Sequence, residues 1–123
     1  MALLLIIEDD DVLRENTKSL LELHGYEVAV AADGNEGLAL LQILKPDLII
    51  CDIMMPGING FEVKSSLNQI PELASIPFIF LTGKTAESAV NMGMSLGASA
   101  FITKPFKVKE VIVRINELLT INR

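Results

Sequence analysis

Leu48-Ile49-Ile50-Cys51 is a continuous apolar run that ends at Asp52. Comparable runs lie on either side of it along the chain, at 3–7 and 78–81, and two weaker strand candidates lie at 27–31 and 100–103. A strand that is apolar at every position is typical of a parallel sheet that is covered on both faces. The sequence therefore predicts five strands, with those at 3–7, 48–51 and 78–81 in the centre.

Segments of helical period separate the strand candidates. The clearest is 108–119, where apolar residues recur every three or four positions and charged residues fill the other face. The first helix is expected to end at His24-Gly25. The second is expected to run from a capping box at Asp33 and Glu36 to Lys45-Pro46. Two more helices are expected to span about 61–69 and 86–97. Five strands that alternate with five helices predict an α/β fold with helices on both faces of the sheet.

Composition limits the function as well as the size. A chain of 123 residues with 50% apolar residues is expected to form one domain, over 1–123. Ten basic against sixteen acidic residues give a formal charge of −6, which argues against a nucleic-acid-binding surface. The single cysteine, Cys51, fits a reducing compartment and predicts a cytoplasmic location. The apolar run at 2–7 has no basic residues before it and four acids after it, so neither a signal peptide nor a membrane span is expected.

Polar residues end four of the five strand candidates, where ligands of open parallel sheets bind. Glu8-Asp9-Asp10-Asp11 follow the first strand, Asp52 the third, Thr82-Gly83 the fourth and Lys104-Pro105 the fifth. Crowded carboxylates imply a bound cation, a retained proton or wide splaying, and Mg²⁺ is the simplest choice for an all-oxygen site. An ammonium and a hydroxyl at the same edge suit a phosphoryl group. The sequence therefore predicts a phosphoryl site at this edge.

Four motifs in order cover the full length: LIIEDD at 5–10, DLIICDIMMPGING at 47–60, LTG at 81–83, and GA at 97–98 followed by FITKPF at 101–106. With these motifs the chain resembles a response-regulator receiver domain of two-component signalling. The resemblance implies a flavodoxin-like (βα)5 three-layer sandwich whose parallel sheet has the strand order 2-1-3-4-5.

The resemblance also implies roles for single residues. Asp52 would be the phosphoacceptor, whose carboxylate attacks a phosphohistidine and becomes an acyl phosphate. Glu8, Asp9, Asp52 and the backbone carbonyl of Met54 would hold Mg²⁺, with Mn²⁺ as a substitute. Thr82 and Lys104 would bind the phosphoryl group, with Gly83 beside Thr82, and Phe101 would be the aromatic residue that moves inward with Thr82. The resemblance also implies a cis peptide bond before Pro105. Met54 and Lys84 would tune the lifetime of the acyl phosphate.

The function implied is a signalling switch rather than a conventional enzyme, although it would catalyse its own phosphorylation and slow autodephosphorylation. The donor would be a histidine kinase or a histidine phosphotransfer protein. An output partner or output domain would read the face made by 86–97, 100–103 and 108–119. Direct binding of nucleic acid or membrane is not expected. Ser99 and Ala100 stand where many family members have two acids that pair with an arginine at the position of Arg114, so a monomer or a weak phosphorylation-dependent dimer is expected.

Three rival functions use some of the same residues. Gly83-Lys84-Thr85 is not the end of a P-loop, because Phe78 stands where the motif requires glycine. A phosphatase of the haloacid dehalogenase type also uses Asp and Mg²⁺ and is the best enzyme alternative, but Met54 stands where its second Asp is required. A flavodoxin-like electron carrier would need a phosphate-binding loop where the acids at 8–11 lie. A pseudo-receiver that binds proteins without phosphorylation is a further alternative.

Overall fold

The computed structural model describes residues 1–83 and 87–121, and within them the chain forms five strands and six helices. The strands are β1 (Leu3–Ile7), β2 (Glu27–Ala31), β3 (Leu48–Asp52), β4 (Phe78–Thr82) and β5 (Ala100–Thr103). The helices are α1 (Asp11–Leu23), α2 (Gly34–Leu40), α3 (Gly60–Asn68), α4 (Pro71–Ala74), α5 (Glu87–Ser95) and α6 (Val108–Ile121).

The five strands form one parallel sheet in the order β2-β1-β3-β4-β5, as the sequence led us to expect. The three continuously apolar strands are the central ones. Along the sheet, Ile7 lies opposite Cys51, Cys51 opposite Phe80, and Thr82 opposite Thr103. Because this register brings the carboxyl ends of the strands level, the residues that end them meet at one edge of the sheet.

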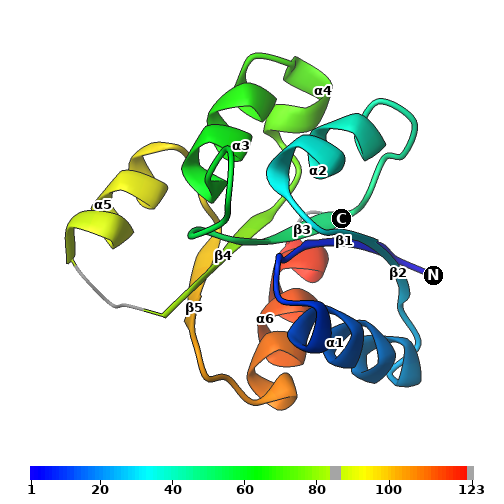
Figure 1. The fold of residues 1–123 in the computed structure, drawn as a ribbon. Helices are drawn as coiled ribbons and strands as arrows, with labels where there is room; N and C mark the ends of the chain where they lie inside the picture. The colour runs from blue at the N-terminus through cyan, green and yellow to red at the C-terminus, as the bar shows by residue number, and fades with distance from the viewer. Residues whose placement is uncertain (84–86, 122–123) are drawn as a thin grey trace.

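Helices cover both faces of the sheet, with α1 and α6 on one side and α2 and α3 on the other (Figure 1). Alternate residues of β1 point to opposite faces, so Leu4 and Ile6 enter one apolar cluster while Leu5 and Ile7 enter the other. All four side chains are buried, which explains why the strand is apolar at every position. Across the described residues, no helix has both the length and the apolar character needed to cross a membrane.

Helix ends follow the local sequence with one clear exception. The Asp10 side chain accepts a hydrogen bond from Leu13 N at 3.0 Å and caps α1. The second helix was predicted to continue to Lys45-Pro46, but α2 ends at Leu40. Beyond that point Ile43 N donates to Leu40 O at 3.0 Å, three residues back, so the chain tightens into turns before it reaches the proline.

The segment between β3 and β4 differs from the prediction of one helix. Helix α3 begins with a reciprocal capping box, in which the side chains of Asn59 and Glu62 each accept from the other residue's N–H at 2.9 Å. A second helix, α4, follows it and begins with Pro71. It is only four residues long, too short to leave a helical period in the sequence. The predicted helix 86–97 corresponds to α5, and Ala86 lies outside the described residues.

Lys64 on α3 is buried, with 2% of its surface exposed. Its Nζ donates to Asn68 Oδ1 at 2.7 Å and to the carbonyl of Ala74, the last residue of α4, at 3.1 Å. Asn68 Nδ2 donates in turn to Leu96 O at 2.8 Å, just beyond α5. Burial lowers the pKa of the Lys64 amine, and the Phe78 ring centroid lies 5.9 Å from Nζ. Lys64 therefore connects α3 with α4, and Asn68 extends this network to the residue just beyond α5.

We expect Lys64→Met to lower the free energy of unfolding by about 1–2 kcal/mol, because Ala74 O and Asn68 Oδ1 lose their donor while the apolar volume is kept. Urea unfolding of the purified protein measures the change. Lys109→Met, at an exposed position on α6, is the matched control and should change stability by less than about 0.5 kcal/mol. Equal stability of both variants and the parent would contradict the connecting role.

Candidate functional site

Four side chains from four strand ends meet at the carboxyl edge of the sheet. Glu8 follows β1, Asp52 ends β3, Thr82 ends β4 and Lys104 follows β5. Lys104 Nζ lies 2.6 Å from Glu8 Oε1 and 3.1 Å from Asp52 Oδ2. Glu8 and Asp52 are buried, with 1% and 5% of their surfaces exposed. One ammonium therefore bridges two carboxylates that are largely removed from water.

The carboxylates of Glu8, Asp9 and Asp52 form a cluster. One oxygen atom from each lies within 4.8 Å of the other two, and Asp9 is exposed while its neighbours are buried. Oxygen ligands of this kind, next to an opening that water can reach, fit a hard divalent cation such as Mg²⁺, which keeps several waters of its own. The donor set thus fits the cation that the sequence predicts.

Three hydrogen bonds hold the backbone and side chain of Glu8 in place. Glu8 N donates to Ala31 O at 3.0 Å, and Asp10 N donates to Glu8 Oε2 at 3.1 Å. Arg14 Nη1, from the first turns of α1, donates to the Glu8 carbonyl at 2.9 Å. Sequence reasoning gave no role to Arg14, since nothing in the pattern relates a helical arginine to a carbonyl six residues earlier. Its contact holds the chain at the point where β1 passes into the acidic loop.

Burial and the shared lysine set the protonation equilibria of the cluster. Burial raises the pKa of the Glu8 carboxyl from 4.5 to about 7, although hydrogen bonds from Lys104 and from Asp10 N–H lower it. Burial also raises the pKa of Asp52, although the hydrogen bond from Lys104 and its positive charge lower it. Burial alone would lower the pKa of Lys104, but its hydrogen bonds to Glu8 and Asp52 outweigh this and raise the pKa. The lysine is therefore charged at neutral pH.

Lys104 and Thr82 are also connected through the backbone. Lys104 N donates to Thr82 O at 2.7 Å, and the Lys104–Pro105 peptide bond is cis, as the resemblance implies. Phe101 on β5 is partly buried, with its ring centroid 5.3 Å from that of Phe80. The ring lies against Gly93 of α5, where even one added carbon would collide with it. The aromatic residue thus connects the strand with the helix that follows Thr82.

A cavity of about 460 Å³ opens above Asp52. Its lining residues are Asp52, Ile53, Met54, Phe61, Thr82, Gly83, Ala89 and Lys104. Met54 has 76% of its surface exposed, and Gly83 is exposed as well. The remaining predicted site residue, Lys84, lies outside the described residues. The structure therefore brings Met54, Gly83, Thr82 and Lys104 to one opening around Asp52.

Gly60 is a site residue whose role the sequence did not reveal, although it lies within the motif at 47–60. A Cβ atom at this position would lie 2.5 Å from the backbone oxygen of Asp52 and 3.0 Å from Ile53 Cα. Gly60 N donates to Ile53 O at 2.9 Å, so α3 starts in direct contact with the end of β3. Only glycine allows this approach, which fixes the backbone that carries Asp52.

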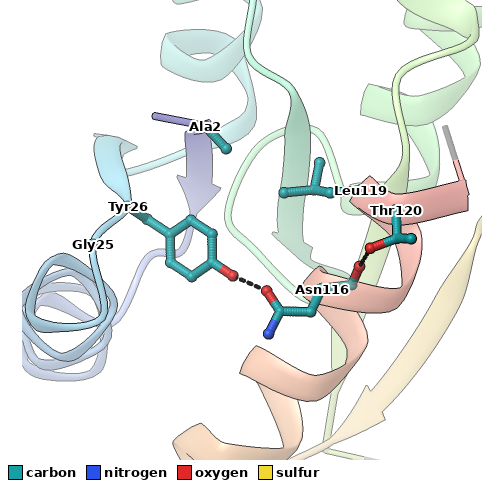
Figure 2. A pocket seen from close by; sticks show the side chains of 6 residues that line it. All are labelled: Ala2, Gly25, Tyr26, Asn116, Leu119 and Thr120. Atoms are coloured by element: carbon teal, nitrogen blue, oxygen red, sulfur yellow. Dashed lines mark hydrogen bonds between the residues drawn. The ribbon is translucent and has the colours of Figure 1, made fainter. Parts of the chain in front are cut away.

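A second cavity, of about 250 Å³, lies near the opposite ends of β1 and β2. Figure 2 shows it between Ala2, Tyr26 and the last turns of α6, with the Tyr26 hydroxyl donating to Asn116 Oδ1. Thr120 Oγ1 donates to the Asn116 backbone carbonyl at 2.7 Å. The described side chains that line this cavity carry no charge, so within residues 1–83 and 87–121 it is unlike the acidic site at the other edge of the sheet.

Residues 4–116 match the family described as response regulator receiver domain. The chain belongs to this family. The resemblance seen in the sequence is therefore confirmed over nearly the whole chain, and it places the protein in two-component signalling, where receiver domains act as phosphorylation-dependent switches.

Named relatives of this receiver chain are response regulators. It is 40% identical to the transcriptional regulatory protein AfsQ1 of Streptomyces coelicolor and 35% identical to the DNA-binding response regulator MtrA of Mycolicibacterium smegmatis, in each case over 97% of this chain. These matches cover 52% and 51% of the two relatives, so the chain spans about half of their length. The solved structure of the chemotaxis protein CheY4 of Vibrio cholerae is 31% identical, with a TM-score of 0.92, and the match covers 96% of this chain and 98% of that one.

We expect Gly60→Ala to lower the free energy of unfolding by about 1–3 kcal/mol, because the new methyl group meets backbone atoms that cannot rotate away. Alanine is otherwise the better helix former, so helix propensity alone predicts the opposite sign. Thermal or urea unfolding distinguishes the two. Gly83→Ala is the control, since no atom of residues 1–83 or 87–121 lies within 4 Å of a Cβ atom there. A similar loss in both variants would contradict the close approach at Gly60.

The raised pKa of Glu8 predicts a pH dependence of stability in the metal-free protein. Between pH 4.5 and about 7 the folded protein holds a proton on Glu8 that the unfolded chain has lost, so stability falls as the pH rises. We expect this group to contribute a loss of about 3 kcal/mol across that range.

The measurement is urea unfolding in a chelator at several pH values, for the parent protein, Glu8→Gln and Glu27→Gln. Glu8→Gln should flatten the dependence, while Glu27→Gln, at an exposed position, should follow the parent curve. Parallel curves for all three proteins would show that the Glu8 carboxyl does not titrate in this range.

Proposed function

We propose that this chain is a signalling switch in which Asp52 accepts a phosphoryl group from a phosphohistidine. The observation that carries the proposal is the buried Asp52 carboxylate, 3.1 Å from the Lys104 ammonium and beside the carboxylates of Glu8 and Asp9. An Asp52 oxygen attacks phosphorus, the P–N bond to the imidazole breaks, and the ring nitrogen keeps the electron pair. The product on Asp52 is an acyl phosphate.

Glu8, Asp9, Asp52 and the backbone carbonyl of Met54 would hold Mg²⁺, with Mn²⁺ as a substitute. When bound, the cation supplies positive charge that screens the approach of a carboxylate to an anionic phosphoryl group. Lys104, which follows β5, supplies a second positive charge, and its ammonium must share its contacts among Glu8, Asp52 and the incoming oxygens. The anionic donor is thus met by cations on two sides.

Phosphorylation replaces the single charge on Asp52 with about −1.5 to −2 and adds strong acceptors. In this proposal Lys104 and the Thr82 hydroxyl bind the new oxygens, and Gly83 permits the loop after β4 to approach. Phe101 follows Thr82 inward. Because the Phe101 ring lies against Gly93 of α5, this movement changes the contact between β5 and α5. Met54 and Lys84 tune how water reaches the acyl phosphate, and Lys84 lies outside the described residues.

The phosphodonor is proposed to be a histidine kinase or a histidine phosphotransfer protein. The output partner or output domain would read the face formed by α5, β5 and α6. Some relatives are named as DNA-binding or transcriptional regulators, yet this chain spans about half of their length. With a formal charge of −6, it is not itself proposed to bind DNA.

Arg114 bears on whether two copies pair through this face. Its guanidinium contacts Glu117 on the same helix at 2.9 Å, and both side chains are about half exposed. Ser99, which replaces an acid found in many family members, instead accepts a hydrogen bond from Phe78 N through its hydroxyl at 3.2 Å. These contacts support a monomer or a weak phosphorylation-dependent dimer.

Intact-protein mass spectrometry after incubation with acetyl phosphate tests the proposal. We expect one added phosphoryl group that requires Mg²⁺ and decays on standing. Asp52→Asn should abolish the adduct, while the matched control Asp47→Asn, at an exposed aspartate five residues earlier, should leave it. If no adduct forms with any donor although Mg²⁺ binds, the proposed phosphoacceptor role is wrong, and a pseudo-receiver becomes the better description.

A further inference from the structure

The two ends of α5 lie in different surroundings. The helix runs along the outer side of the molecule, from the carboxyl edge of the sheet back toward the start of β5 (Figure 1). Ala89, in its first turn, lines the cavity above Asp52. Gly93, in its middle, lies against the Phe101 ring. The helix ends at Ser95, away from the acidic site, and we call this its far end.

The far end of α5 is held by a side chain of another helix. Asn68, the last residue of α3, donates from Nδ2 to Leu96 O at 2.8 Å. The chain then turns at Gly97, whose φ of +93° is the left-handed conformation that ends many helices. Two residues later Ser99 N donates to the carbonyl of Phe78, on β4, at 2.8 Å. The segment 96–99 is therefore attached both to α3 and to the sheet.

The buried Lys64 ammonium orients the Asn68 amide. Asn68 is exposed, and an exposed amide gains little from one hydrogen bond, because water competes for it and its rotamer must be fixed. Lys64 Nζ lies one helical turn before it and donates to Asn68 Oδ1 at 2.7 Å. An ammonium can only donate, and burying it is costly unless its donors are used. Lys64 therefore selects the orientation in which Asn68 presents Oδ1 to the lysine and Nδ2 to Leu96.

We propose that Lys64 and Asn68 are positioning residues that make the far end of α5 a pivot, so that phosphorylation of Asp52 moves the other end of the helix. The inference rests on the proposed function and specifies how the phosphoryl site regulates α5. Nine residues form a helix about 13 Å long, so a rotation about Leu96 displaces Ala89 much farther than the residues beside the pivot. Helix α5 then acts as a lever with one fixed end.

Amide hydrogen exchange of the whole chain tests the pivot, with Asn68→Asp as the first variant. The aspartate keeps an acceptor for Lys64 but has no N–H for Leu96 O, so the contact with the far end of α5 is lost. Without phosphorylation, we expect exchange at 96–99 to become about five- to tenfold faster, with exchange in β1 unchanged. Asn16→Asp, the same change at an exposed position on α1, is the control and should match the parent in both segments.

The second measurement repeats hydrogen exchange with Mg²⁺ and acetyl phosphate, while intact mass gives the phosphorylated fraction of the same samples. In the parent protein we expect phosphorylation to change exchange at 88–91 by at least about threefold more than at 96–99. In Asn68→Asp the change should extend to 96–99, because the far end is no longer held. A merely structural loss would raise exchange equally with and without the phosphoryl group, and would not redistribute the response.

Lys64→Met is the second variant, since Asn68 then loses the donor that orients it, and it should redistribute the response in the same way. Exchange in β1 serves as the internal reference for any general loss of stability. If 96–99 responds as strongly as 88–91 in the parent, or if either variant keeps the parent pattern, the pivot is overturned while the switch remains. Absence of a phosphorylated parent protein would instead overturn the proposed function, and the pivot with it.

Discussion

The bridge from Lys104 to Glu8 and Asp52 is the interaction around which this edge of the fold is built. Two buried carboxylates next to each other are costly unless a positive charge lies between them. The ammonium can reach both only because β1, β3 and β5 end at the same level of one sheet. The strand order and register are therefore conditions for the site, and the apolar clusters on both faces hold that register in place.

Much of this arrangement was predictable from the sequence, because it depends on patterns that the chain carries locally. Strands apolar at every position must be buried on both faces, and this placed β1, β3 and β4 at the centre of the sheet. Polar residues directly after such strands must then gather at one edge, which is how Glu8, Asp52 and Lys104 could be grouped before their contacts were known. Recognition of the receiver motifs added the strand order.

Features that depend on contacts between distant segments were not predictable in the same way. The close approach of Gly60 to the Asp52 carbonyl, and the reach of Arg14 to the Glu8 carbonyl, leave no periodic signal. Lys64 reads as a surface residue of an amphipathic helix until α4 and the end of α5 are placed around it. The early end of α2 and the four-residue helix α4 are features too short to leave a helical period in the sequence.

The hydrogen bond from Lys104 N to Thr82 O joins the end of β4 to the end of β5. Thr103 lies opposite Thr82 in the sheet, so the backbone next to the two side chains proposed to bind the phosphoryl group is held at two consecutive residues. A displacement of one strand end would therefore carry the other strand end with it. In a switch of the proposed kind, the hydroxyl and the ammonium would respond to a single phosphoryl group together, as two contacts on one rigid support.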